Sequence, residues 1–334
     1  MLRSLRQFVG KITGLNNIFN PIYAQLNILN DRQTEISSSL TEVKQWLDKQ
    51  YHLVQTLRVD NKTVITKIFT DLKMYLNPSD MAVAAHIALD GVWEKEITRA
   101  WLTVLKPDYT VLDIGANFGY FGLLSGQFTD RNKARIVLFE ANKHIVPYVN
   151  RSISINWFNE HVKVENLAVS DENGEVTLTV LKDYTGSSSV QSFDHLKEYM
   201  NNRMQLEVSE KLKVQAVSID EYCANHSIKD VNLIKMDIEG YEEQAYKGMR
   251  AIINKSKDIT LFIEFTKDGY NEPKQFYNTM LHDFGNVFII DKTGAIVAPA
   301  DSSYEGVIES SYGWTMPIFS KNSKLDRMKN TIIG

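Results

Sequence analysis

The apolar residues of the first quarter of the chain recur in alternating steps of four and three. They fall on the a and d positions of a heptad pattern that only Gln33, Gln50 and Asn61 interrupt. The apolar members are Ile22, Leu26, Leu29, Ile36, Leu40, Val43, Leu47, Val54, Leu57, Val64 and Ile68. This spacing predicts a long helix that joins copies of the chain through residues 22–68, so we expect a homo-oligomer.

The predicted coiled coil has one polar position with a specific expected role. A buried asparagine at an a position usually fixes register and strand number, so Asn61 is expected to select the oligomer. The alternative is a helix pair that folds back on its own catalytic domain. The break at residues 76–79, Leu-Asn-Pro-Ser, separates a helical segment, residues 1–76, from a second domain, residues 77–334.

Residues 77–334 read as strands alternating with helices, which predicts an α/β, Rossmann-like sheet. The expected strands share short buried-strand patterns, several of which end in an acidic residue. They cover residues 109–114, 134–139, 162–169, 231–236 and 260–263. The expected helices include residues 120–128, 219–225 and 243–253.

The first of these strands runs directly into a glycine turn and a helix. Glycine allows close backbone approach, and amides at a helix N-terminus suit a nucleotide or a carboxylate ligand. Asp113 stands two residues before Gly115, where its charge would repel a pyrophosphate. A sulfonium cofactor carries an amino group and no phosphate. The turn therefore favours S-adenosylmethionine over a dinucleotide.

The second and third strands supply the other half of the expected cofactor site. Glu140 follows the second strand, where a carboxylate accepts hydrogen bonds from ribose hydroxyls. Asn166, Leu167 and Ala168 are expected on the adenine side of the same crevice.

Carboxylates also gather at the ends of the fourth and fifth strands. Asp237, Glu239 and Glu242 follow the fourth strand, and Glu264 follows the fifth. Asp237, Glu239 and Glu264 are therefore candidates for a general base. Asp237 has a second possible role, orienting the amino group of the cofactor. A divalent metal held by Asp237, Glu239 and Glu264 is a third interpretation, although no metal is included in the preferred one.

Composition limits the binding partners and the cellular compartment that we expect for this protein. The formal net charge of −4 argues against a basic nucleic-acid surface, and no run of about 18 apolar residues indicates a membrane span. The single cysteine, Cys223, excludes a disulfide framework within one chain and fits a cytoplasmic protein. One helical face at the N-terminus, formed by Leu2, Leu5, Val9 and Ile12, allows weak contact with a membrane surface.

Several motifs, in this order, resemble those of the FkbM-type methyltransferase family. They are Leu112–Tyr120 (LDIGANFGY), Phe139–Asn142 (FEAN), Ala168–Asp171 (AVSD), Gly186–Ser189 (GSSS) and Ile234–Glu242 (IKMDIEGYE). The similarity covers about residues 88–319, with Ala141 where the family often has proline. It implies a class I methyltransferase fold and methyl transfer to a hydroxyl of a sugar, glycan or secondary metabolite. It also places an acid before the first strand, here Glu94, which is expected to close over the cofactor.

Together these arguments give one set of cofactor-binding candidates. They are Glu94, Asp113, Gly115, Ala116, Asn117, Gly119, Glu140, Ala141, Asn142, Ala168 and Asp237. The expected acceptor is a small molecule or glycan, whose specificity should reside in residues 181–213 and beyond residue 298. Gly186 to Ser189 form either part of the acceptor pocket or a plain turn, and His144 lies either at the crevice rim or on the surface.

Two other classes of protein remain open on the sequence. One is a nucleotide-binding oxidoreductase on the same fold, although its fingerprint would require glycine in place of Asn117. The other is a coiled-coil scaffold with an inert methyltransferase-like domain, which the retained acids argue against.

Overall fold

The computed structural model describes residues 56–328, except residues 70, 185, 187, 191–206, 268 and 310–314. The described residues all belong to one compact unit. The heptad positions from Ile22 to Val54 therefore lie outside the described residues, as does the N-terminal apolar face. Within the described part, no helix is both long and apolar enough to cross a membrane.

The last turns of the predicted coiled coil are strands, so the helix prediction is wrong for residues 56–68. β1 (Thr56–Asp60), β2 (Thr63–Ile68) and β3 (Leu72–Leu76) form an antiparallel sheet. Asn61 lies in the turn between β1 and β2, where its Oδ1 accepts a hydrogen bond from Arg58 Nη2. It is exposed and occupies no helical a position.

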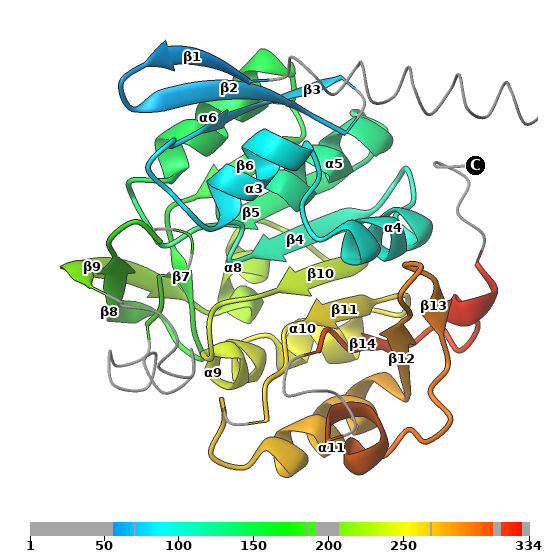
Figure 1. The fold of residues 1–334 in the computed structure, drawn as a ribbon. Helices are drawn as coiled ribbons and strands as arrows, with labels where there is room; N and C mark the ends of the chain where they lie inside the picture. The colour runs from blue at the N-terminus through cyan, green and yellow to red at the C-terminus, as the bar shows by residue number, and fades with distance from the viewer. Residues whose placement is uncertain are drawn as a thin grey trace, which may run out of the picture. The chain divides into compact units, whose positions relative to one another are not determined.

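The helix prediction failed because the same residues fit both a heptad spacing and the alternating pattern of a strand. β2 is rich in β-branched residues, which favour strands, and β3 buries every second residue. β3 also packs on α6 (Val146–Ile155), as Figure 1 shows, so residues 56–76 belong with the α/β unit.

A mixed eight-stranded sheet forms the centre of this unit, in the order β13-β12-β14-β11-β10-β4-β5-β6. The parallel strands are β4 (Thr110–Ile114), β5 (Arg135–Phe139), β6 (Val162–Glu165), β10 (Leu233–Met236) and β11 (Thr260–Ile263). The antiparallel strands are β12 (Asn286–Ile290), β13 (Ile296–Val297) and β14 (Ile318–Ser320). The predicted α/β class is confirmed.

The third predicted strand is two strands in different sheets. β6 ends at Glu165, and β7 (Ala168–Val169) joins β8 (Gly174–Leu181) and β9 (Val208–Val217) in a separate sheet. Asn166 fixes the turn between β6 and β7, because its side-chain amide donates to the carbonyls of Glu140 and Ala141. This turn carries Leu167 and Ala168 past the end of β5.

Helices cover both faces of the central sheet (Figure 1). They are α3 (Val83–Asp90), α4 (Lys95–Val104), α5 (Tyr120–Phe128), α6, α8 (Ile219–Asn225), α9 (Glu242–Lys247), α10 (Arg250–Lys255) and α11 (Pro273–Phe284). Short helical turns follow at Glu305–Glu309 and Leu325–Arg327. Successive residues of β4 face opposite cores, Val111 with α4 and α5, and Leu112 with α8 to α11.

The predicted helix 243–253 is interrupted at Gly248. A Cβ atom there would lie 2.1 Å from the carbonyl oxygen of Ser170, so the chain needs glycine for this close approach. The helix therefore divides into α9 and α10.

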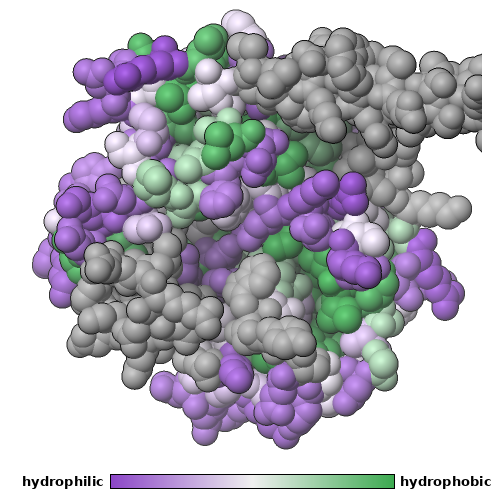
Figure 2. Space-filling model, in the orientation of Figure 1, coloured by the Kyte–Doolittle hydropathy of each residue, from purple (hydrophilic) through white to green (hydrophobic). Residues whose placement is uncertain are grey.

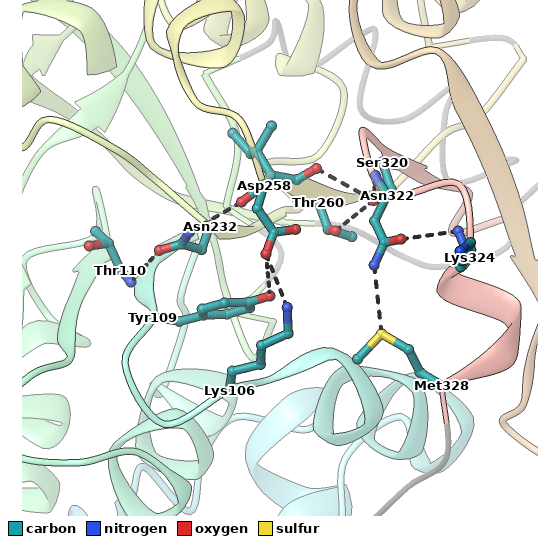
Figure 3. A network of polar contacts seen from close by, with 11 residues as sticks. Lys106, Tyr109, Thr110, Asn232, Asp258, Thr260, Ser320, Asn322, Lys324 and Met328 are labelled. Carbon is teal, nitrogen blue, oxygen red and sulfur yellow. Dashed lines mark hydrogen bonds and ion pairs between the residues drawn. The ribbon is translucent and has the colours of Figure 1, made fainter.

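Hydrogen bonds of polar side chains connect the amino ends of the parallel strands (Figure 3). Asn232, which precedes β10, accepts from the amide of Thr110 and donates to the carbonyl of Asp258. The Asp258 carboxylate accepts from Lys106 Nζ and the Tyr109 hydroxyl. This amino-end network fixes β4, β10 and β11 relative to one another and leaves their carboxyl ends available for a site.

Candidate active site

Two adjoining pockets lie at the carboxyl ends of the parallel strands. The apolar pocket is lined by Ile114, Phe139, Glu140, Ala141, Leu167, Ala168, Val169, Leu178, Ser188, Val190, Ile238 and Tyr241. The carboxylate pocket is lined by Trp93, Glu94, Asp113, Ala116, Asn117, Phe118, Tyr120, Phe121, Lys235 and Glu264, with Ala82, Val83 and Ile87. Gly115, Gly186, Asp237 and Glu239 line both. Figure 2 shows a hydrophilic hollow where β4 and β10 end in Figure 1.

The backbone amides of the glycine turn after β4 donate hydrogen bonds to other groups of the protein. Those of Gly115 and Ala116 donate to the carbonyl of Phe139, and that of Gly119 donates to Ala116. The Asn117 amide donates to Glu140 Oε2, and the Phe118 amide donates to the Asn117 side chain. These hydrogen bonds shape the turn, and the binding of a ligand by its amides stays a prediction.

Position 115 needs glycine because the backbone after β10 passes close to it. It adopts a φ of +77°, and a Cβ atom on it would lie 1.9 Å from the carbonyl oxygen of Asp237. The turn after β4 and the loop after β10 consequently meet backbone to backbone. This contact forms the junction between the two pockets.

Glu140 occupies the tip of β5, as predicted, with its carboxylate in the apolar pocket. Its Oε2 accepts from the Asn117 amide and its Oε1 from the Asn142 amide, both at 2.7 Å. Each oxygen retains lone-pair capacity for a further donor, such as a ligand hydroxyl. Burial raises the pKa of Glu140 to about 7, although the two amide hydrogen bonds lower it.

The carboxylate pocket contains five acids and one cation among the described lining residues, so its charge favours a cationic ligand. Burial raises the pKa of Asp113 to about 6 and that of Glu94 to about 7, although the Lys235 cation opposes both shifts. Glu94 adopts a φ of +44°, which is uncommon for a residue with a side chain. Its buried Oε2 makes no hydrogen bond with the described residues and lies 3.8 Å from Lys235 Nζ.

The loop after β10 holds Asp237 and Glu239 between the pockets. Glu242, the third acid of the predicted cluster, lines neither pocket. Its Oε1 accepts from the amides of Ile238 and Gly240, and its Oε2 accepts from the Tyr270 hydroxyl. Glu242 therefore fixes the loop in which Glu239 has a φ of +55°.

Gly186, in the serine-rich turn, covers the junction. Its amide donates to Asp80 Oδ2, and its carbonyl accepts from the side chain of Asn117. Ser189 Oγ donates to the carbonyl of Glu239. The turn thus ties the loops after β4 and β10 together over the two pockets.

Most of the predicted residues converge on these pockets. Glu94, Asp113, Gly115, Ala116, Asn117, Glu140, Ala141, Ala168, Asp237, Glu239 and Glu264 line one or both. Gly119 and Asn142 line neither: Gly119 begins α5, and Asn142 supports Glu140. His144 forms an exposed pair with Glu210, so it belongs to the surface.

Among the described charged residues that line the pockets, Lys235 is the one to which the sequence reasoning assigned no role. It is 4% exposed, and its Nζ lies 2.7 Å from Asp237 Oδ2. A lysine inside an otherwise apolar parallel strand was the available signal, because such strands are buried on both faces. Within the described residues, no group of three or more His, Cys, Asp or Glu side chains is arranged to hold a metal ion.

The fold and the pockets define a Rossmann-like ligand-binding domain, in which ligands bind at the carboxyl ends of parallel strands. A family model of the methyltransferase FkbM domain matches residues 113–288, more than half of the chain. The chain therefore belongs to the FkbM methyltransferase family, and the resemblance found in the sequence is confirmed.

Two curated relatives are similar over part of their length. The 2-O-methyltransferase NoeI of Sinorhizobium fredii is 26% identical over 161 residues, which cover 46% of this chain and 63% of NoeI. The AMB antimetabolite synthetase AmbE of Pseudomonas aeruginosa is 25% identical over 192 residues, 50% of this chain and 9% of AmbE. The chain thus spans less than two thirds of either relative.

Among solved structures, an FkbM methyltransferase from Methylobacillus flagellatus aligns with a TM-score of 0.38 at 18% identity. The alignment covers 64% of this chain and 44% of that protein.

Proposed function

We propose that this protein transfers a methyl group from S-adenosylmethionine to a hydroxyl of a sugar, glycan or secondary metabolite. The observation that carries the proposal is the pair of joined pockets, one apolar with a carboxylate at its strand tip and one rich in acids. S-adenosylmethionine has the matching parts: a largely apolar adenine, a ribose with two hydroxyls, a sulfonium and an α-amino group.

The chain's own residues fit such a cofactor. Glu140 would accept hydrogen bonds from the ribose, and Leu167, Ala168 and Leu178 would contact the adenine. Glu94 and Asp113 would face the amino group, since the buried Glu94 Oε2 has no hydrogen-bond donor among the described residues. Five acids would also repel a pyrophosphate, which argues against a nicotinamide dinucleotide.

The reaction requires alignment and removal of one proton. The bound cofactor supplies a methyl group already activated by the positive sulfur. The pockets would place the acceptor oxygen in line with that methyl group and exclude water. As the oxygen–carbon bond forms and the sulfur–methyl bond breaks to leave a neutral thioether, Asp237, at the junction of the pockets, would accept the hydroxyl proton. Glu239 and Glu264 are the other candidates.

Transfer to oxygen is supported by the name of NoeI, a 2-O-methyltransferase, and by the carboxylates available as a base. The acceptor itself is proposed only as a class. Assembly through residues 22–55, a cytoplasmic location and weak membrane contact at the N-terminus remain predictions.

Calorimetry tests the cofactor first. We expect S-adenosylmethionine and S-adenosylhomocysteine to bind and NAD⁺ not to bind. Tight binding of NAD⁺ alone would establish the oxidoreductase alternative, and binding of none of the three would favour the scaffold. Transfer of a labelled methyl group to a panel of oligosaccharides then tests the acceptor: an ether product resists mild base, whereas a methyl ester is hydrolysed.

Cofactor affinity should depend on pH. Glu94 and Glu140 have pKa values raised to about 7, so they are largely protonated at pH 6 and ionised at pH 8. Because the ionised forms suit a cation and hydroxyl donors, we expect S-adenosylmethionine to bind more tightly as the pH rises from 6 to 8. Calorimetry in buffers of different ionisation enthalpy should detect proton release near pH 7.

The free protein should show the opposite trend in stability. Carboxyl groups with pKa values raised from 4.5 to about 7 stabilise the folded state at low pH, and that contribution is lost as the pH rises. The melting temperature without ligand should fall between pH 5 and pH 8, while the increase caused by the ligand should grow. An affinity that is constant across this range would contradict the proposed roles of Glu94 and Glu140.

A further inference from the structure

Lys235 lies deep in the carboxylate pocket, on β10, which is flanked by the parallel strands β4 and β11. In the register of β10 and β4 it stands opposite Asp113, and in that of β10 and β11 opposite Phe262. Its Nζ is 4.9 Å from the centre of the Phe121 ring. The rigid sheet therefore fixes one positive charge beneath the junction of the two pockets.

The Lys235 ammonium lies closer to one of the surrounding acids than to another. Its Nζ forms a 2.7 Å ion pair with Asp237 Oδ2 and lies 3.8 Å from Glu94 Oε2. Lys235 thus neutralises mainly Asp237, one of the two acids that line both pockets.

Lys235 keeps its proton in this setting. Burial alone would lower its pKa, but the carboxylates of Asp237, Glu94 and Asp113 outweigh that effect and raise it above the ordinary range. It is consequently unsuited to act as a base. Its influence on a ligand must come from its fixed charge and from the orientation that it gives to Asp237.

We propose that Lys235 is a positioning residue that offsets the Asp237 charge, and that it thereby limits how strongly the site prefers a sulfonium ligand over a neutral thioether. This inference rests on the proposed function. S-adenosylmethionine carries a positive sulfur, and S-adenosylhomocysteine carries a neutral one. A site that stabilises the positive sulfur too strongly would oppose transfer, because that charge disappears as the reaction proceeds.

The ratio of two dissociation constants measures this effect without an acceptor. The two ligands share the adenosine and amino-acid groups, so most other contacts cancel in the ratio of the S-adenosylhomocysteine Kd to the S-adenosylmethionine Kd. The measurement is made by calorimetry at pH 8.5, above the raised pKa values of Glu94 and Asp113. At this pH the ratio reports the charge near the sulfur.

Lys235→Met and Asp237→Asn should change the ratio in opposite directions. Lys235→Met removes the cation and should raise the ratio about tenfold, whereas Asp237→Asn leaves the cation unopposed and should lower it about tenfold. Lys321→Met is the matched control, because Lys321 is a partly buried lysine that donates to the carbonyls of Ile253, Asn254 and Ser256 away from both pockets. Its ratio should equal that of the wild type.

Each outcome has a distinct meaning. If both ligands bind and neither variant changes the ratio, Lys235 is only a structural ion-pair partner and the inference is wrong. If Lys235→Met lacks a cooperative thermal transition, the ratio measured for Asp237→Asn tests the inference: a lower ratio supports it, and an unchanged or higher ratio contradicts it. If the wild type binds neither ligand, the proposed function fails and the inference fails with it.

Discussion

Replacing Gly115 by alanine should weaken S-adenosylhomocysteine binding at least about 100-fold, a larger effect than any other single methyl group is expected to have. The added Cβ would lie 1.9 Å from the carbonyl oxygen of Asp237, and the φ of +77° is unfavourable for alanine. The loops after β4 and β10 would separate, and the junction between the pockets would lose its shape. Calorimetry and thermal unfolding measure the two consequences.

Gly174→Ala is the matched control for this substitution. Gly174 begins β8, and a Cβ atom on it would meet no atom within 4 Å. Its affinity should stay within about twofold of the wild type. Wild-type affinity in Gly115→Ala would show that the backbone contact at the junction is unimportant for ligand binding.

Replacing Glu140 by alanine should produce the second large effect. Two buried amides, those of Asn117 and Asn142, would lose their acceptor, at about 1–3 kcal/mol each, and the proposed ribose contact would disappear. We expect the affinity for S-adenosylhomocysteine to fall about 100-fold. The affinity of the Glu140→Gln variant for S-adenosylhomocysteine should fall about tenfold, since the NH₂ group of glutamine would face one of the two amide donors.

Glu165→Gln provides the comparison for Glu140. Glu165 ends the adjacent strand β6, accepts from the Tyr222 hydroxyl and lies in neither pocket. The amide oxygen of glutamine can still accept that bond, so ligand affinity should be unchanged. An equal loss in the Glu165 and Glu140 variants would point to a general defect of the sheet instead of a ligand contact.

The strand–turn–helix unit at residues 110–128 was predictable because its signals are local. A short apolar strand, a glycine turn and a helix follow without a gap, and the structure has β4 and α5 in those places. The convergence of acids was also predictable, since parallel strands bring their carboxyl ends to one edge. Asp113, Glu140 and Asp237 reach that edge from three strands.

Other features depend on contacts that no local pattern contains. Residues 56–68 match a heptad spacing, yet pairing with β3 and packing against α6 produce strands. The role of Gly115 depends on the carbonyl of Asp237, more than 100 residues away. Lys235 and Glu242 have roles set by partners across the loop and the sheet, so their residue types alone could not assign them.

The two ends of the parallel strands have separate tasks. Lys106, Asn232 and Asp258 join the strands at their amino ends, whereas the residues that would choose an acceptor lie at the opposite ends. Substitutions at Val190 or Tyr241 can therefore alter ligand preference while the hydrogen bonds that join the strands stay intact. Such a division allows a lineage, or a designed library, to explore new acceptors at little cost to folding.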